Sequence, residues 1–169
     1  GIFRNVVLYA KPELHVEDLW AKPVLETDGK TGSFSMELTV SARDTAADKT
    51  GQLGSVSWRI VKQGTADIRG AGTVLIEGGK EIHIQIPSQT IPDVRPWSHE
   101  DPFLYLLEIR VKNVRGEIVE IVPYEIGFRR IAMDHGIMTL NGKRLILHGV
   151  NRHEWSAEGG RVITEAQMR

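Results

Sequence analysis

The sequence predicts an all-β fold, a sandwich of about seven strands, followed by the beginning of an α/β unit. Three observations support this prediction. Successive segments of residues 14–128 alternate apolar and polar residues, which is the pattern of strands with one buried face. Turn-forming residues separate these segments, and no helical apolar period lies between them. Residues 131–169 then hold a continuous apolar run, a polar loop and a helix-start pattern.

The seven expected strands have the spacing of a sandwich, and a small barrel with the same patterning is the alternative. They cover residues 15–25, 33–43, 54–61, 72–77, 80–87, 102–113 and 117–128. Pro23 places the first strand at a sheet edge, because proline has no N–H to donate to a neighbouring strand. Gly78-Gly79 predicts a hairpin between the fourth and fifth strands, and residues 114–117 predict another between the sixth and seventh.

Two aromatic residues resemble the core of an immunoglobulin-type domain. Trp58 lies mid-strand on the apolar face, where such a sandwich places its central tryptophan. Tyr105 begins the sixth strand two positions before Leu107, which is the spacing of a tyrosine corner in which Leu107 takes the place of a cysteine. We interpret both aromatic residues as core residues rather than as binding residues.

The histidines outside the C-terminal polar loop show no metal-ligand pattern. His83 alternates with isoleucines in its strand and is expected to face solvent. His15, His99 and His135 have no Cys or His partner at metal-ligand spacing, so we expect no metal site in this sequence.

Composition excludes several classes of protein. The 169 residues include 21 basic and 22 acidic ones, without the basic surplus that non-specific nucleic-acid binding needs. No apolar stretch approaches the roughly 18 residues of a membrane span. Cysteine is absent, which excludes disulfides and thiol chemistry and fits a cytoplasmic location while leaving export open. The chain begins without methionine, and residues 5–10 already have a strand pattern, so we expect an internal start.

The C-terminal region predicts one incomplete βα unit. Asn141-Gly142 between apolar flanks predicts a hairpin turn. Residues 144–150 form a near-continuous apolar run, typical of a parallel strand buried on both faces. Thr164 and Gln167 predict a capping box, in which Thr164 accepts a hydrogen bond from the N–H of Gln167 while the Gln167 side chain reaches back. A helix is therefore expected to start just before the chain ends.

The polar loop between this strand and this helix is the candidate site. It contains Asn151, Arg152, His153, Glu154 and Trp155 in succession. In α/β folds, functional groups gather just beyond the carboxyl ends of strands. These side chains offer an amide, a guanidinium fork, a titratable imidazole, a carboxylate and a stacking face. Position and composition alone leave a solvated loop, with Arg152 and Glu154 paired locally, as an equal alternative.

Four segments occur in an order that resembles a known family. They are GIFRNVVL (1–8), PWSHEDPFLYLLEIRV (96–111), YEIGFRRI (124–131) and LNGKRLILHGVNRHE (140–154). Together they resemble the central part of family-two glycoside hydrolases, most closely the bacterial β-galactosidases. The resemblance implies three parts: residues 1–11 as the last strand of a sugar-binding jelly roll, 12–130 as an immunoglobulin-like β-sandwich, and 131–169 as the truncated entry hairpin and first βα unit of a (β/α)₈ TIM barrel.

The resemblance implies a retaining exo-glycosidase that acts on terminal β-linked sugars, most closely β-galactosides. Its two catalytic Glu residues would lie on later barrel strands, so no catalytic residue is expected in this segment. We reject Glu154, Glu158 and Glu165 as substitutes, because one unfinished βα unit cannot hold two carboxylates around one sugar.

By the same resemblance, His153 lies in the sugar subsite and helps to stabilise the transition state. Asn151 and Arg152 support the floor and rim of that subsite, and Glu154 contacts these residues rather than the sugar. Trp155 stands where Asp or His is commoner in the family. The magnesium and sodium ligands typical of the family's β-galactosidases lie outside the segment, so these ions are expected only in a full-length parent. The expected partners are a β-galactoside, the remaining domains of the same chain and further copies of it in a homo-oligomer.

Two alternatives stay open. One is a fragment of a β-glucuronidase or β-mannosidase, which share much of this plan. The other is a stand-alone immunoglobulin-like module that binds carbohydrate or mediates adhesion. Such a module needs an exposed row of aromatic side chains, whereas Trp20, Trp58, Trp97 and Trp155 are scattered along the sequence.

Overall fold

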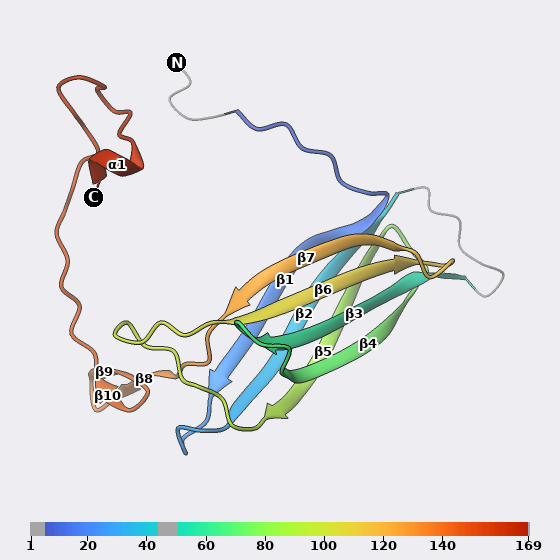
Figure 1. Cartoon of the computed structure of the whole chain (residues 1–169), viewed down its shortest axis with the longest axis horizontal. Coiled ribbons are helices and arrows are strands. Elements are labelled where there is room, and N and C mark those ends of the chain that lie inside the picture. The colour runs from blue at the N-terminus through green and yellow to red at the C-terminus, as the bar shows by residue number, and fades with distance from the viewer. Residues whose placement is uncertain (1–5, 44–50, 169) are drawn as a thin grey trace. The chain divides into compact units, whose positions relative to one another are not determined.

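The computed structural model describes residues 6–43 and 51–168 (Figure 1). The chain divides into two compact units, one formed by residues 11–145 and the other by residues 1–10 together with 146–169. The larger unit contains every strand of the described chain, and the smaller unit contains the helix α1 (Glu165–Met168).

Two antiparallel sheets form the larger unit and confirm the predicted sandwich. The three-stranded sheet has the order β1-β2-β5, and the four-stranded sheet has the order β4-β3-β6-β7. The strands are β1 (Leu14–Leu25), β2 (Gly32–Ala42), β3 (Gln52–Lys62), β4 (Ile68–Glu77), β5 (Glu81–Ile91), β6 (Tyr105–Asn113) and β7 (Ile118–Ile126). Each overlaps one of the seven expected segments. The two sheets share no strand, so the described residues do not close into a small barrel.

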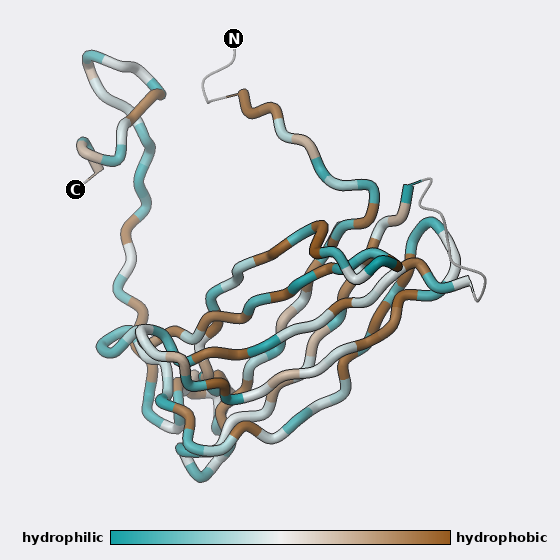
Figure 2. The backbone as a smooth tube through the Cα atoms, turned by 45° about the vertical axis from the view of Figure 1, so that its right-hand side comes forward, coloured by the Kyte–Doolittle hydropathy of each residue, from teal (hydrophilic) through white to brown (hydrophobic). Residues whose placement is uncertain are grey.

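Alternating apolar residues build the core between the sheets. Along β2, buried and partly exposed residues alternate over the whole strand, and Figure 2 shows this alternation of hydropathy along the strands. Trp58 on β3 is 3% exposed, and its ring centroid lies 5.2 Å from that of Phe34 on the facing sheet. A Cβ on Gly72 would lie 2.8 Å from the indole nitrogen of Trp58, so this glycine gives the indole its space. Trp58 is therefore a core residue, as predicted.

Tyr105 forms the predicted tyrosine corner. Its side chain is 1% exposed, and its hydroxyl accepts a hydrogen bond from the backbone N–H of Arg95 at 2.8 Å. The ring packs edge-on against Phe103 and Phe128, at centroid distances of 5.1 and 5.3 Å. Leu107 is fully buried. The corner thus fastens the loop before β6 to the core.

The Gly78-Gly79 turn does not form the predicted hairpin. Both glycines have positive φ, 49° and 98°, so a tight turn is present. It leads from β4, which pairs with β3, to β5, which pairs with β2, and so it crosses from one sheet to the other. Periodicity indicates where a strand lies but not which strand it pairs with, and the hairpin prediction was wrong for this reason. The second predicted hairpin, between β6 and β7, is confirmed.

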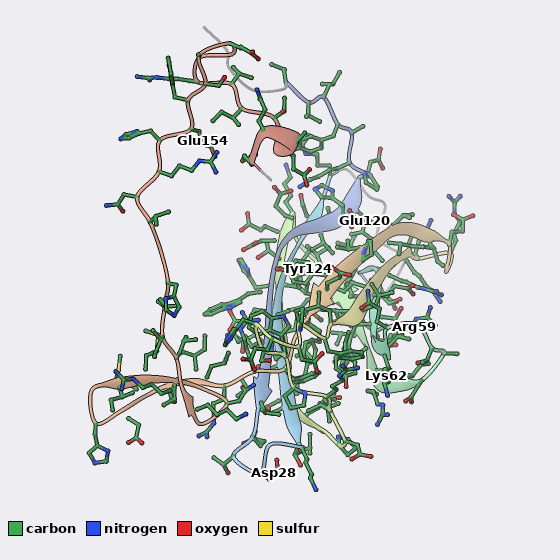
Figure 3. The ribbon with its side chains drawn as sticks, turned by 60° about the vertical axis from the view of Figure 1, so that its left-hand side comes forward. Asp28, Arg59, Lys62, Glu120, Tyr124 and Glu154 are labelled. Carbon is green, nitrogen blue, oxygen red and sulfur yellow. The ribbon has the colours of Figure 1, made fainter. Side chains whose placement is uncertain are left out.

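The edges of the two sheets meet along β1 and β7. β1 is an edge strand, as Pro23 predicted. A β-bulge between Val16 and Asp18 interrupts its pairing with β2. The N–H of Val16 donates a hydrogen bond of 2.7 Å to the carboxylate of Glu120 on β7, which is labelled in Figure 3. This hydrogen bond joins the edge strand of one sheet to the edge strand of the other.

The turn between β1 and β2 is organised by Asp28, also labelled in Figure 3. Its carboxylate accepts hydrogen bonds from the Thr31 hydroxyl at 2.6 Å, from the Thr31 N–H at 2.8 Å and from the Lys30 N–H at 2.9 Å. The Thr31 hydroxyl and these backbone N–H groups lower the pKa of Asp28 to about 2, because each hydrogen bond favours the charged carboxylate.

His15 and His83 occupy opposite environments. His15 is buried, with Nδ1 2.6 Å from the carbonyl oxygen of Pro12 and Nε2 2.9 Å from the carboxylate of Glu17. Hydrogen bonds from Lys11 and His15 lower the pKa of Glu17. His83 faces solvent, as predicted, beside the hydroxyl of Thr39. The burial of His15 follows from the packing of its strand, which its sequence neighbours do not reveal.

A short meander follows the sandwich. It consists of β8 (Ile131–Asp134), β9 (Ile137–Leu140) and β10 (Lys143–Arg144) in the order β10-β9-β8. The predicted Asn141-Gly142 turn joins β9 to β10, with φ of 52° and 79°. The Asn141 side chain accepts a hydrogen bond from the Arg130 N–H at 2.9 Å and donates one to the Trp97 carbonyl at 3.0 Å. Asn141 therefore makes the turn and also fixes the meander to the loop before β6.

The apolar run 144–150 does not form the predicted buried strand. Only residues 143 and 144 belong to a strand, and Ile146, Leu147 and Val150 are 61%, 75% and 89% exposed. A strand buried on both faces needs neighbours that pair with its backbone. Beyond Arg144, which pairs with Thr139 of β9, no described strand pairs with this run. The strand pattern of residues 5–10 fails in the same way over its described part, because residues 6–10 belong to no strand.

The predicted capping box is confirmed in one of its two bonds. The Gln167 side chain reaches back and accepts a hydrogen bond from the Thr164 N–H at 3.0 Å. The Thr164 hydroxyl donates to the same side-chain oxygen at 3.1 Å instead of accepting from the N–H of Gln167. That N–H bonds to the Thr164 carbonyl at 3.0 Å, which is the first turn of α1.

Candidate functional site

The four predicted site residues lie in an irregular segment of the smaller unit. Asn151, Arg152, His153 and Glu154 belong to no helix or strand, and all four side chains are exposed. Figure 3 labels Glu154 on this segment. The side chains of Asn151, Arg152 and His153 make no hydrogen bond within the described part of the chain. The segment presents these groups to solvent one after another.

The next residues form a closed loop. Ser156 and Gly160 exchange two backbone hydrogen bonds, of 2.8 and 2.9 Å, and the Ser156 hydroxyl accepts a third from the Gly159 N–H at 2.9 Å. Gly160 has a φ of 61°, a conformation that favours glycine. Ile163 is buried directly before the capping box. The polar segment is therefore followed by ordered local structure that leads into α1.

This arrangement can supply groups that bind a sugar. An amide, a guanidinium and an imidazole donate and accept hydrogen bonds of the kind that sugar hydroxyls make. Glu154, Glu158 and Glu165 are all exposed. A retaining glycosidase needs two carboxyl groups about 5–5.5 Å apart on a rigid frame. The rejection of these three residues as catalytic groups stays a prediction.

A cleft of about 380 Å³ in the larger unit was not predicted. It lies among the β1–β2 turn, the loop before β6 and the meander. Charged or titratable residues of both signs line it: Glu26, His99, Glu100, Asp101, Arg130, Lys143 and Arg144. Asp101 is engaged by Arg95 through two hydrogen bonds of 2.8 and 3.0 Å. These residues come from three distant segments, so no local motif indicates the cleft.

A second charged cluster lies on the outer face of the four-stranded sheet. Arg59 donates two hydrogen bonds, of 3.0 and 3.2 Å, to the carboxylate of Glu108, and Arg110 donates a third. These contacts, with Arg59 first, lower the pKa of Glu108. The Glu108 side chain is 14% exposed, and the cluster fixes three long side chains on this face. Figure 3 labels Arg59 within it.

Neither a metal-ligand cluster nor a membrane-spanning helix occurs in the described residues. No group of three or more His, Cys, Asp or Glu side chains in residues 6–43 and 51–168 is placed to hold a metal ion. No helix in the same residues has the length and apolar character needed to cross a membrane.

Comparison with known proteins identifies the family. Residues 14–129 match the glycosyl hydrolases family 2, and residues 131–169 match the TIM barrel domain of glycosyl hydrolases family 2. The chain belongs to this family. The two matches follow each other along nearly the whole sequence, so the family-two resemblance found from the residues is confirmed.

Several curated relatives in the family are β-galactosidases. The chain is 36% identical to the β-galactosidase large subunit of Lactobacillus acidophilus over 99% of its length, which is 25% of that protein. It is 38% identical to the β-galactosidase of Streptococcus thermophilus over 99% of its length, or 15% of that protein. It is 36% identical to that of Clostridium acetobutylicum, again over 99% of its length, or 17% of that protein. The chain thus spans a quarter or less of these relatives.

Solved structures of two β-glucuronidases share the fold. The β-glucuronidase of Parabacteroides merdae superposes with a TM-score of 0.73 over 93% of this chain and 19% of that protein, at 24% identity. The β-glucuronidase of Ruminococcus gnavus superposes with a TM-score of 0.66 over 92% of this chain and 22% of that protein, at 19% identity. At such identity the likeness concerns the fold alone.

Proposed function

We propose that this chain acts as part of a retaining β-galactosidase that hydrolyses terminal β-D-galactosides. The observation that carries the proposal is the continuous similarity to β-galactosidases, at 33–38% identity over 97–100% of the chain. Because the chain spans so little of these relatives, it supplies the sandwich and one arc of the sugar site, while the carboxylate pair belongs to other parts of the protein. Residues 1–11 form the last strand of a sugar-binding domain, and residues 12–130 form the sandwich. Residues 131–169 form the entry hairpin and first βα unit of the barrel.

In this proposal the polar segment contributes to sugar binding. His153 contacts the sugar and stabilises the transition state through a hydrogen bond from its imidazole. Asn151 and Arg152 form the floor and rim beside it, and Glu154 contacts these two residues. The exposure of all four side chains supports this role, because residues that receive a substrate must be accessible when the site is empty.

The same proposal extends to the metal ions, the oligomeric state and the cellular location of the enzyme. Magnesium and sodium would be bound by residues outside this segment. The sandwich would brace the barrel and take part in a homo-oligomer, and the cysteine-free composition supports a cytoplasmic location. Each of these points is open to direct measurement on the full-length protein.

The test uses the full-length protein that carries this segment. We expect release of nitrophenol from nitrophenyl β-galactoside to exceed release from the matching β-glucuronide and β-mannoside. We expect His153→Ala to lower kcat by roughly 10²–10³-fold, the loss typical of one hydrogen-bond donor to a transition state. Arg161→Ala, an exposed residue of the same unit outside the motif, is the matched control and should leave kcat unchanged. Faster hydrolysis of the β-glucuronide would assign the protein to that class instead.

A further inference from the structure

The outer face of the three-stranded sheet carries an exposed tryptophan among polar residues. The buried residues of β2 alternate with outward ones, and its outward row is made of Ser, Thr and Glu. On the edge strand β1, Trp20 faces outward and is 61% exposed. Burial of a tryptophan is the usual outcome in a sandwich, as it is for Trp58. This exposed ring provides an accessible flat apolar surface beside hydroxyl groups on the same sheet face.

Strand register places three of these side chains in one line. Trp20 on β1 pairs with Glu37 on β2, and Glu37 pairs with Gln85 on β5. Directly paired residues lie on the same face of a sheet, about 4.5–5.5 Å apart at their Cβ atoms. The line therefore runs across all three strands, with an aromatic ring at one end, a carboxylate in the middle and an amide at the other end.

A bulge hollows the sheet beside this line. The register of β2 and β5 shifts between Phe34 and Met36, so that Pro87 and Ser88 lie opposite the single residue Ser35. Bulges of this kind redirect side chains and often border functional sites. Here the bulge opens a groove of about 320 Å³, lined by Lys22, Ser35, Glu37, Gln85, Pro87 and Ser88 among others. That volume lies at the small end of the range for ligand pockets, about 300–1,000 Å³.

The charges in this groove cancel. Lys22 donates a hydrogen bond to the carboxylate of Glu37, and its ammonium lies 3.7 Å from the centroid of the Trp20 ring. The ion pair leaves the groove with no net charge and fixes the indole from one side. Since Trp20 keeps 61% of its surface exposed, the ring is open to a ligand on its other side.

The groove also contains unused hydrogen-bonding groups. The Gln85 amide and the hydroxyls of Ser35 and Ser88 make no side-chain hydrogen bond among the described residues. Together they offer donors and acceptors of both kinds beside an aromatic ring. A pyranose ring has the complementary chemistry, with C–H groups on its flat faces and hydroxyls around its rim. An anion would lack a net positive charge to bind, and an apolar partner would leave these polar groups unpaired.

We propose that this face, defined by Trp20, Lys22, Ser35, Glu37, Gln85 and Ser88, is a binding site for neutral oligosaccharides. One sugar ring stacks on Trp20, and its hydroxyls bond to Glu37 and Gln85 along the line across the strands. The next ring lies over the groove beside Ser35 and Ser88. The site uses none of the residues of the polar segment, so it goes beyond the proposed hydrolase and stands or falls independently of it.

The test is a titration of the isotope-labelled 169-residue chain with β-1,4-galactotriose, followed by NMR. We expect saturable shifts of the indole N–H of Trp20 and of the side-chain amide of Gln85. Trp20→Ala should weaken binding at least roughly tenfold, and Gln85→Ala should weaken it severalfold. Tyr124→Ala is the matched control, because Tyr124 is 48% exposed but lies on β7 of the other sheet, and this variant should bind normally.

Three results would overturn the proposal. The first is an absence of saturable shifts at Trp20 up to millimolar trisaccharide. The second is equal shifts at Trp20 and Tyr124, which would mean non-specific stacking. The third is methyl β-glucuronide binding at least as tightly as methyl β-glucoside, which would mean recognition of an anion. Unchanged melting of Trp20→Ala relative to the parent chain establishes that a loss of binding does not come from unfolding. Since no hydrolysis is measured, failure here leaves the β-galactosidase proposal untouched, and the reverse also holds.

Discussion

The hydroxyl oxygen of Tyr105 lies 2.8 Å from the backbone nitrogen of Arg95 and accepts its N–H as a hydrogen bond. The two residues belong to different segments, one to the start of β6 and the other to the loop before it. Because the Tyr105 side chain is 1% exposed, water cannot replace this acceptor without opening the core.

Tyr105→Phe should therefore lower the free energy of unfolding by about 1–3 kcal/mol, the cost of a backbone N–H left without a partner. The measurement is urea unfolding of the chain. Tyr124→Phe is the control, because Tyr124 is 48% exposed and its hydroxyl makes no hydrogen bond in the described residues. We expect that control to change stability by less than about 0.5 kcal/mol. Equal effects of the two substitutions would contradict the role of the corner.

Asn141 should control the attachment of the meander. Asn141→Ala removes the side-chain bonds to the Arg130 N–H and the Trp97 carbonyl and places alanine at a φ of 52°. We expect a loss of about 2 kcal/mol, with faster amide exchange over residues 131–145 than over the sandwich strands. Lys143→Ala, which changes an exposed neighbour, should leave exchange unaltered. Uniform acceleration over the whole sandwich would show that Asn141 stabilises the fold globally instead.

The Asp28 turn should titrate in strong acid. Its pKa of about 2 lies below the ordinary value of 3.8, so the folded state favours the charged form. The stability that this preference contributes is complete above pH 3.8 and is lost as the pH falls toward 2. Carboxyl NMR of the folded chain should give a midpoint near 2 for Asp28. Thr31→Val removes the hydroxyl that contributes most, and the midpoint should then rise. An unshifted midpoint in the parent chain would contradict the hydrogen-bonded turn.

The polar segment should exchange its amide hydrogens rapidly. Residues 146–155 belong to no helix or strand, and no backbone hydrogen bond is found for their N–H groups in the described chain. In a dilute solution of the chain we expect exchange close to that of an unstructured peptide. The buried strand β3 in the same sample is the internal reference for slow exchange. Strong protection of residues 146–155 would mean that this segment forms structure that its own backbone does not supply.

The isolated 169-residue chain should release no nitrophenol from nitrophenyl β-galactoside. The reason is chemical, since a retaining mechanism needs two positioned carboxyl groups and the glutamates near the polar segment are exposed. The measurement must include Glu154→Gln, because turnover that persists in this variant would come from a contaminant. Turnover that follows the purified chain and disappears in Glu154→Gln would overturn the expectation.

The strands could be predicted from the sequence because their causes are local. Trp58 and Tyr105 stand in segments whose period of two fixes which side chains face inward, and the structure agrees at both positions. The partner with which a strand pairs is not determined by its local sequence. Gly78-Gly79 makes the tight turn that glycines favour, yet β5 pairs with β2 because of packing contacts spread over the whole sandwich.

The candidate site was predictable as a motif but not as a geometry. Residues 151–154 stand out by their composition and by their position after an apolar run, and both features can be read from the local sequence. Whether they converge on a ligand depends on groups distant in sequence, and residues 146–150 directly before them have no strand partner in the described chain. The groove beside Trp20 escaped prediction for a related reason, because strand register and a bulge bring its parts together.

The bond between Val16 and Glu120 has a consequence for aggregation through the sheet edges. Two open sheet edges are templates on which another chain can add a strand, and such addition starts aggregation. Here β1 carries a bulge and a proline, and it directs one backbone donor to a side chain of β7 rather than outward. At this side of the sandwich the β1 and β7 edges bond to each other, so they offer less of a template for strand addition by a neighbouring molecule.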